Sequence, residues 1–497
     1  MTAIPFDNSY VRLPDRFFSR RAPTPVAAPR LIRLNRALAA NLGMDPDWLA
    51  GLAGVEMLAG NRVPEGADPI ATVYAGHQFG NFVPQLGDGR AVLIGEVIDR
   101  DGQRRDIQLK GAGPTSFSRR GDGRAALGPV LREYLVSEAM AALGIPTTRA
   151  LAAVATGDQV LRETRLPGAV LARVAASHIR VGTFQYFAAR GDAEAVRALA
   201  DHALALALAL ARHYPEASSA EHPYRALLDG VVARQADLVA AWLLVGFVHG
   251  VMNTDNMSVA GETIDYGPCA FLDDYDPRTS FSSIDAHGRY AYGQQPGIAL
   301  WNLTRLAETL LPLLAEDEAA AVEAAEAALA GFSPRFEAAY RGGLAHKLGL
   351  SADLDGAVAL ADDLLARMAG DQADFTLTFR RLCDAAERPE ADAGVRDLFV
   401  DPTVYDGWAV RWRELLAEGG RNPTATAAAM RAVNPAFIPR NHHVEAMIAA
   451  AVERADFGPF EELLAVLSRP YDDQPAHARY AEAPEGGGAD YRTFCGT

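Results

Sequence analysis

The fold of this 497-residue chain is read most directly from HGVMNTDNMSVAGETIDYG, residues 249 to 267. Asn256 stands seven residues after His249, and Asp265 opens an Asp-Tyr-Gly triplet nine residues later. An amide and a carboxylate on two adjacent turns are ligand types for a Mg²⁺ ion that bridges nucleotide phosphates. A simple acidic turn is the alternative, because Asp and Asn are common turn residues. The order and spacing of both features favour a nucleotide and metal site.

The same stretch matches the protein-kinase pattern H-R-D-L-x-x-x-N followed by D-F-G, with one important exception. Gly250 and Val251 occupy the positions of the Arg and of the Asp that serves as the kinase base. A carboxylate, Asp255, instead stands beside Asn256. The residues alone leave open whether the chain is an inactive kinase or a site with different chemistry.

A lysine and a glutamate further upstream complete a kinase-like set. Only two of the 47 basic residues are lysines, Lys110 and Lys347. Lys110 ends a predicted strand, and Glu133 follows 23 residues later on a predicted helix. Kinase folds pair a strand lysine with a helix glutamate to hold a phosphate-contacting ammonium group. Two unrelated surface charges are the alternative, and the scarcity of lysine argues against it.

Two glycine-rich segments flank Lys110. QLGDGRAVLIGE contains Gly87 and Gly89, whose backbone N–H groups are candidates for phosphate contacts. A plain hairpin turn is the default explanation of a lone Gly-x-Gly, and only its place one hairpin before Lys110 favours the phosphate site. The second segment, KGAGPTSFSRRGDGRAALG (110–128), is unusually basic for this position in a kinase. Arg173 and Arg180 follow on strand-like sequence, where solvated surface arginines are the default interpretation.

The periodicity predicts an α+β chain with a kinase-like bilobal fold. Residues 90–110 form a predicted hairpin, 129–144 a helix, and 147–161 and 168–182 strands. The apolar runs 203–211 and 241–248 are predicted buried helices. We therefore predict a strand-rich N-terminal lobe (1–184), a larger helical lobe (185–470) and an irregular C-terminal tail (471–497).

Composition narrows the function classes. A net charge of −16 argues against nucleic-acid and anionic-membrane partners, which favour basic surfaces. No apolar run reaches the roughly 18 residues needed to cross a bilayer. Three cysteines are too few for a disulfide framework, and the Arg- and Ala-rich composition is typical of a GC-rich bacterial genome. We expect a bacterial cytoplasmic protein, with a monomer favoured.

Beyond these patterns, the chain resembles the SelO family, the selenoprotein O-like proteins of kinase fold. The resemblance runs from FDNSYVRLPD through YAGHQFGNFVPQLGDGRA, DIQLKGAGPTSFSRRGDGRAALGPVLREYL and HGVMNTDNMSVAGETIDYGPCAFLDDYDP to NPAFIPRNH and a C-terminal cysteine. It implies a protein adenylyltransferase that transfers AMP from ATP, bound in a flipped orientation, to Ser, Thr or Tyr hydroxyls of protein substrates. UTP is a possible second nucleotide.

The resemblance also implies roles for individual residues. Asn256 and Asp265 would hold Mg²⁺ or Mn²⁺, Glu133 would orient Lys110, and Asp255 would accept the proton. The residues implied to contact ATP are Gly87, Gly89, Arg90, Lys110, Asp122, Gly123, Arg173, Arg180 and Asp265.

The cysteines carry one further implication of the resemblance. The resemblance to some bacterial members implies a redox switch, in which a C-terminal cysteine pairs with a cysteine just past the Asp-Tyr-Gly triplet. The corresponding residues are Cys495 and Cys269, so a reversible disulfide between them is expected; two incidental reduced thiols are the alternative. Cys383 is predicted to lie in a helix core.

Two other functions remain open from the residues alone. A small-molecule or protein kinase would use the same metal ligands, but the kinase base is missing. A non-catalytic nucleotide-binding scaffold is the other alternative, and the presence of both metal ligands argues against it.

Overall fold

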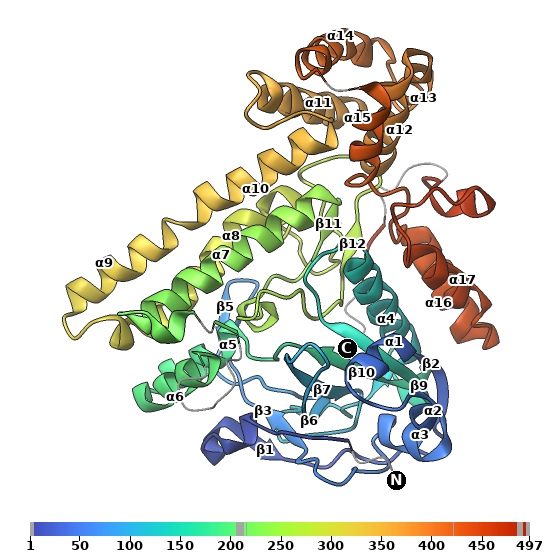
Figure 1. Cartoon of the computed structure of the whole chain (residues 1–497). Helices are drawn as coiled ribbons and strands as arrows, with labels where there is room; N and C mark the ends of the chain where they lie inside the picture. The colour runs from blue at the N-terminus through green and yellow to red at the C-terminus, as the bar shows by residue number, and fades with distance from the viewer. Residues whose placement is uncertain (1–3, 205–212, 215, 421, 485–490, 494–497) are drawn as a thin grey trace.

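The structure, a computed structural model, describes residues 4–204, 213–214, 216–420, 422–484 and 491–493. Its described residues combine helices and strands, as the predicted α+β class requires. Most strands gather at one end of the molecule, and the long helices extend away from them (Figure 1).

An antiparallel sheet forms the N-terminal part, in the order β1-β3-β6-β7-β10-β9-β2, with β8 paired to β10. The bounds are β1 Phe18–Arg20, β2 Arg30–Leu34, β3 Ile70–Thr72, β6 Ala91–Ile98, β7 Arg104–Lys110, β8 Ala125–Ala126, β9 Arg149–Leu161 and β10 Arg165–Ala175. The predicted hairpin is β6–β7, and the strands predicted over 147–161 and 168–182 are β9 and β10. β10 ends at Ala175, seven residues before the predicted end.

The side chains of β7 point alternately to the two faces of the sheet, which places its functional side chains on one face. Ile107 and Leu109 are fully buried in a core shared with three short helices, α1 Arg36–Asn41, α2 Pro46–Ala50 and α3 Leu52–Leu58. Successive strand residues point to opposite faces, so Gln108 and Lys110 lie on the other face.

That other face is covered by α4, Leu127–Ala142, which packs on β9 and β10. The predicted stop at Gly144 is present, with a φ of +79° that suits glycine. Two late helices, α16 Asn441–Arg454 and α17 Gly458–Leu467, pack on α4 in turn, so residues far apart in sequence lie side by side (Figure 1).

Helices dominate after β10. Their bounds are α5 Val181–Ala188, α6 Ala193–Leu204, α7 Pro223–Leu244, α8 Gln295–Leu314, α9 Glu318–Leu329, α10 Phe332–Lys347, α11 Ala357–Asp371, α12 Phe375–Glu387, α13 Asp392–Arg396, α14 Thr403–Glu418 and α15 Pro423–Arg431. The predicted boundary between residues 184 and 185 falls inside α5. Cys383 is buried in α12, as predicted. The tail beyond 470 is largely irregular in its described part, with a 3₁₀ helix over Pro475–Tyr480.

Of the two apolar runs, one differs from the prediction and the other is described only in part. The helix predicted over 241–248 is wrong at its end: α7 stops at Leu244, and β11, Phe247–Val248, pairs with β12, Ala270–Phe271. Gly246, with a φ of +76°, provides the turn between helix and strand. Of the run 203–211, Ala203 and Leu204 end α6, and the remainder lies outside the described residues.

Candidate active site

A cleft of about 390 Å³ lies where the sheet meets the 249–267 segment. Its lining includes seven of the predicted site residues, Arg90, Lys110, Arg173, Arg180, Asp255, Asn256 and Asp265. Arg90 directly precedes β6, Lys110 ends β7, and Arg173 lies on β10. Arg180 directly precedes α5, and the other three belong to the 249–267 segment. The tertiary structure therefore brings together side chains up to 175 residues apart in sequence.

Asp265 is the electrostatic centre of the cleft. Arg173 Nη1 lies 2.6 Å from Asp265 Oδ1, Lys110 Nζ lies 3.4 Å from the same oxygen, and Arg180 forms a salt bridge with Oδ2. Burial raises the pKa of Asp265, but Arg180, Arg173 and Lys110 together hold it well below its usual range. Asp265 has a φ of +64°, a conformation uncommon for a non-glycine residue. The carboxylate is thus ionised and held in a fixed position.

Glu133 forms the second anionic point. It projects from α4 and forms salt bridges with Lys110 and with Arg173 Nη1, the latter at 3.1 Å. Burial raises its pKa, and the Lys110 and Arg173 charges lower it below the ordinary value. The structure therefore brings Lys110 and Glu133 into the contact that their spacing predicts, and it adds Arg173 to the pair.

Asp255 and Asn256 lie on a 3₁₀ turn, Thr254–Asn256, across the cleft. Asn256 Nδ2 donates to the carbonyl of Val251 at 2.9 Å, which leaves the amide oxygen available to a metal. Arg180 Nη1 donates to the Asp255 carbonyl at 2.6 Å, so one guanidinium joins this turn to Asp265. Val251 also lines the cleft, where it offers no proton acceptor.

The Asp255 side chain is buried and only partly satisfied. Gln78 Nε2 donates to Oδ2 at 3.2 Å, while Oδ1 is buried without a hydrogen-bond partner among the described residues. Burial raises the pKa of Asp255 to about 6. Such a carboxylate is a stronger base than an exposed aspartate.

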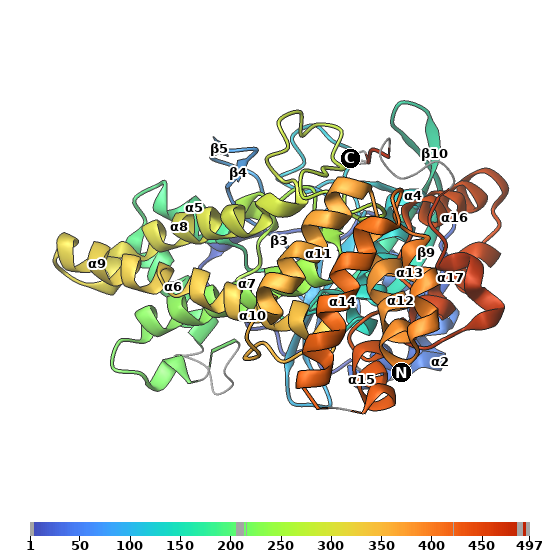
Figure 2. The same cartoon turned by 90° about the horizontal axis from the view of Figure 1, so that it is seen from above.

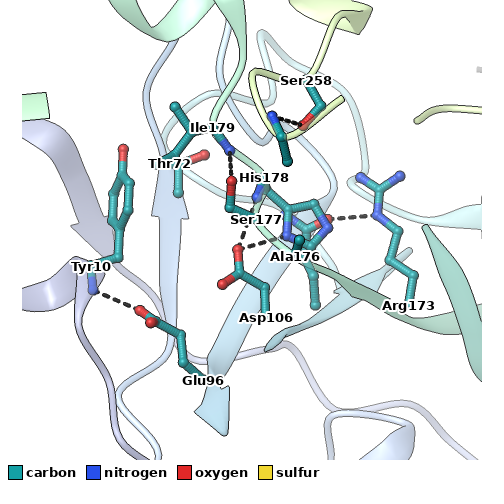
Figure 3. A network of polar contacts seen from close by, with 12 residues as sticks. Tyr10, Thr72, Glu96, Asp106, Arg173, Ala176, Ser177, His178, Ile179 and Ser258 are labelled. Carbon is teal, nitrogen blue, oxygen red and sulfur yellow. Dashed lines mark hydrogen bonds and ion pairs between the residues drawn. The ribbon is translucent and has the colours of Figure 1, made fainter. Parts of the chain in front are cut away.

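A polar network behind the cleft positions the segment between β10 and α5 (Figure 3). Arg173 Nε donates to Gln108 Oε1 at 2.8 Å, which fixes the guanidinium on the sheet. Asp106 Oδ2 accepts from the backbone N–H of His178 at 2.9 Å and lies 3.0 Å from its ring nitrogen Nδ1. Burial lowers the pKa of His178. Sequence reasoning missed Gln108, Asp106 and His178; the polar side chains of β7, alternating with Ile107 and Leu109, were the available signal.

The glycines of the first loop serve packing in this structure. A Cβ at Gly87 would lie 2.5 Å from the Phe117 ring, and one at Gly89 would lie 2.9 Å from the Phe117 carbonyl. Both loops therefore fit against each other only with glycine at these positions. Their neighbours Asp88 and Arg90 line the cleft.

Asp122 and Gly123 lie in the second loop, outside the lining of the cleft. Asp122 forms a salt bridge with Arg162 at 2.9 Å, and a Cβ at Gly123 would clash with the backbone of Gly113. The structure therefore groups seven predicted residues in the cleft and places Gly87, Gly89, Asp122 and Gly123 in the loops beside it.

Two oxygen donors in the cleft could hold a divalent metal ion. Among the described residues, no three His, Cys, Asp or Glu side chains cluster as a metal site. Asp265 and Asn256 offer one carboxylate and one amide oxygen. That set suits Mg²⁺, which takes few protein ligands and completes its shell with phosphate and water.

The cysteines are described only in part. Cys269 and Cys383 are buried, free thiols, and Cys495 lies outside the described residues. Burial raises the pKa of Cys269 to about 12. The expected Cys269–Cys495 pairing therefore stays a prediction.

A sequence model of the family described as protein adenylyltransferase SelO matches residues 1–468 of this chain. The chain belongs to the SelO family. It is 71% identical over 504 aligned positions to the protein nucleotidyltransferase YdiU of a Methylorubrum extorquens strain, covering 100% of both chains. It is 66% identical to the protein of the same name from a Rhodopseudomonas palustris strain, covering 99% of both.

Membership of the SelO family at this identity makes the chain an enzyme of nucleotidyl transfer. The cleft with its cations, carboxylates and amide is the place in the described structure that suits this chemistry. No helix in the described part of this SelO-family chain is both long and apolar enough to cross a bilayer.

Proposed function

We propose that the chain is a protein adenylyltransferase that moves AMP from ATP to Ser, Thr or Tyr hydroxyls and releases pyrophosphate. It would do so on a kinase-like bilobal frame, in which Lys110 on β7 and Glu133 on α4 correspond to the strand lysine and helix glutamate. The names of the relatives, protein nucleotidyltransferases, support protein as the acceptor class. UTP would be a second donor nucleotide.

The observation that carries the proposal is the concentration of cations around Asp265. Lys110, Arg173 and Arg180 bring three positive charges, and Glu133 and Asp265 bring two negative charges. The Arg173 and Arg180 side chains are 3% and 2% exposed, so these cations are shielded from water. Attack at the α-phosphorus develops charge on the departing pyrophosphate, and shielded fixed cations stabilise such charge strongly.

In this proposal the β- and γ-phosphates lie against those cations, and the α-phosphate faces the acceptor. Phosphate oxygens would replace Asp265 as partners of the guanidinium groups, and the freed carboxylate oxygens, with the Asn256 amide oxygen, would hold Mg²⁺ or Mn²⁺. The bound ion would supply charge neutralisation at the phosphates. Every other contribution comes from side chains of the cleft.

Proton removal would fall to Asp255, because Val251 cannot accept a proton. The acceptor hydroxyl gives its proton to the Asp255 carboxylate as its oxygen bonds to the α-phosphorus. The bond from that phosphorus to the bridging oxygen breaks, and its electron pair leaves with pyrophosphate. Gln78, bonded to Asp255 Oδ2, orients the carboxylate.

The proposal includes redox control by a Cys269–Cys495 disulfide. Thr493 Oγ1 donates to the Pro268 carbonyl at 2.8 Å, so the described end of the tail contacts the residue before Cys269. Since burial raises the Cys269 pKa, the attacking thiolate would come from Cys495. Two thiols would pass two electrons and two protons to a disulfide oxidant, and the bond would hold the tail over the cleft.

The test uses ATP labelled at either the α- or the γ-phosphate, with Mg²⁺ and a bacterial protein extract. Label on protein from the α-position, with release of pyrophosphate, is the expected result. Label from the γ-position would overturn the proposal in favour of a kinase, and no label from either position would favour a scaffold. Asp255→Ala should reduce the α-label by about 10²- to 10⁴-fold, while Asp237→Ala, at an exposed ion pair, should not.

A further inference from the structure

A short hairpin beside the cleft is tied to the turn that carries Asp255. The hairpin consists of β4, Gly76–Gln78, and β5, Asn81–Val83. The His77 N–H donates to Thr254 Oγ1 at 2.7 Å, and the Phe79 N–H donates to Asn253 Oδ1 at 3.1 Å. A Cβ at Gly76 would lie 2.3 Å from Asp255 Oδ1. The hairpin therefore forms a fixed wall next to the proposed base.

The outer side of this wall is aromatic. His77 contacts the rings of Phe82 and Trp301, with centroids 4.9 and 5.2 Å away, and Trp301 comes from α8. Figure 2 shows the hairpin beside α8 on one side of the molecule. Phe82 is 39% exposed, and Ile284, which lines the cleft itself, is 61% exposed. Two large apolar side chains are thus accessible, Ile284 in the lining of the cleft and Phe82 on the hairpin beside it.

Arg289 adds a positive charge at the same place. Its guanidinium lies 4.8 Å from the Trp301 ring centroid and 5.7 Å from that of Tyr290. In the part of the chain that the structure describes, Arg289 has no salt-bridge partner, unlike Arg173 and Arg180 in the cleft.

The nearest carboxylate in sequence is committed elsewhere. Asp285 Oδ1 accepts from the Arg289 N–H at 2.9 Å, and Oδ2 accepts from the Tyr290 N–H at 2.8 Å and from the Ser280 hydroxyl at 3.2 Å. These bonds shape the 285–290 turn and leave the Arg289 side chain on the aromatic rings. A guanidinium held this way can take a carboxylate from another molecule.

We propose that this surface, made of Phe82, Ile284, Arg289 and Trp301, binds the acceptor protein and selects a hydroxyl residue with an acidic neighbour. Ile284 and Phe82 would contact apolar atoms of the acceptor segment, and Arg289 would pair with an Asp or Glu close to the modified residue. The occupant is an extended, acidic protein segment. The inference rests on the proposed transfer of AMP to protein and names its substrate preference.

Two fluorescein-labelled peptides test the proposal. Each carries one Ser, one Thr and one Tyr; in one peptide the flanking residues are Asp and Glu, and in the other they are Asn and Gln. Fluorescence anisotropy measures their Kd in the presence of Mg²⁺ and α,β-methylene-ATP, and ATP affinity is measured separately. The wild-type enzyme should bind the acidic peptide about 10- to 100-fold more tightly, as expected for a charge-assisted contact.

The variants and their controls are matched. Arg289→Gln should remove the preference, Arg289→Lys should keep part of it, and Ile284→Asp should weaken both peptides. Two controls should behave as wild type: Arg335→Gln, at an exposed position on α10, and Val400→Asp, at an exposed position between α13 and α14. ATP affinity should be unchanged in the Arg289 variants and in the two controls.

Three results would overturn the inference: equal or no binding of the two peptides by the wild type, an unchanged preference in Arg289→Gln, or an equal loss of ATP affinity in that variant. Failure of the proposed function is recognised separately. In that case the acidic peptide binds as expected, but α-labelled ATP transfers no label to it.

Discussion

Two clusters of buried charge lie eight residues apart on one segment of the chain, and they differ in what they leave accessible. Around Asp265, three cations face two carboxylates, and the Asp265 side chain stays 20% exposed toward the cleft. Around Asp273, a single guanidinium, that of Arg440, contacts Asp273 Oδ1 at 2.7 Å and Asp374 Oδ2 at 2.6 Å. Arg440 is completely buried.

The second cluster is a structural anchor. Arg440 also donates to the Ala481 carbonyl at 3.0 Å, and Asn441 Nδ2 donates to the Phe271 carbonyl at 2.8 Å. Together these contacts join the segment after Asp-Tyr-Gly to α12, α16 and the tail. Buried charges alone therefore do not identify a functional site, because both clusters have them. The cluster around Asp265 differs in having more positive than negative side chains and an opening to solvent, and these two features together indicate a site.

The largest expected effect on activity comes from removing the carboxylate at the centre of the Asp265 cluster. Asp265→Ala should lower the proposed AMP transfer by about 10³-fold or more, because one substitution removes the carboxylate proposed to hold the metal ion and the shared partner of three cations. Single-turnover transfer from α-labelled ATP measures it, with circular dichroism to verify folding. A folded variant that retains more than a tenth of the activity would contradict the proposed role of Asp265.

Removing the guanidinium from the Asp273 cluster should lower the stability of the folded protein. Arg440→Met leaves two buried carboxylates unpaired and should lower the free energy of unfolding by about 3–5 kcal/mol. The matched control is Arg335→Met, whose salt bridge with Asp237 is about half exposed and should be worth at most about 1 kcal/mol. Urea unfolding measures both. Equal losses in the two variants would show that the Arg440 cluster is no anchor.

Lys347 offers a third case for comparison, a buried cation that has no carboxylate partner in the described structure. Lys347 is buried, with Nζ 4.4 Å from the Phe379 ring centroid and no salt-bridge partner among the residues that the structure describes. Burial lowers its pKa from 10.5 to about 7. Because the unfolded chain holds this proton more tightly, the stability of the wild type should rise with pH between about 7 and 10.5.

Lys347→Met should remove that dependence. At pH 7 the variant should be more stable by about 4 kcal/mol, and its advantage should shrink as the pH approaches 10.5. Urea unfolding of both proteins at several pH values measures the difference. Parallel pH profiles for the two proteins would contradict a lowered pKa at Lys347.

Local patterns in the chain were sufficient for much of the fold. Alternation along 104–110 predicted β7, and the order and spacing of His249, Asn256 and Asp265 predicted a nucleotide-binding loop. Where local propensity competes with pairing, the prediction was wrong: Phe247 and Val248 follow an apolar helix in sequence, but β12 supplies hydrogen bonds that end the helix early.

By itself, the sequence was sufficient for strands β6, β7, β9 and β10 and for helix α4, because spacing along a helix or strand fixes which neighbouring side chains share a face. Its motifs were also sufficient for the Lys110–Glu133 pairing and for the resemblance to the family. Only the tertiary structure decided that Arg173 and Arg180 converge on Asp265, that Gly87 and Gly89 accommodate Phe117, and that Arg440 joins Asp273 to Asp374. These contacts span up to 167 residues. The packing of the sheet and helices determines which residues meet in these contacts. The hydrophobic periodicity within one segment carries no information about that packing.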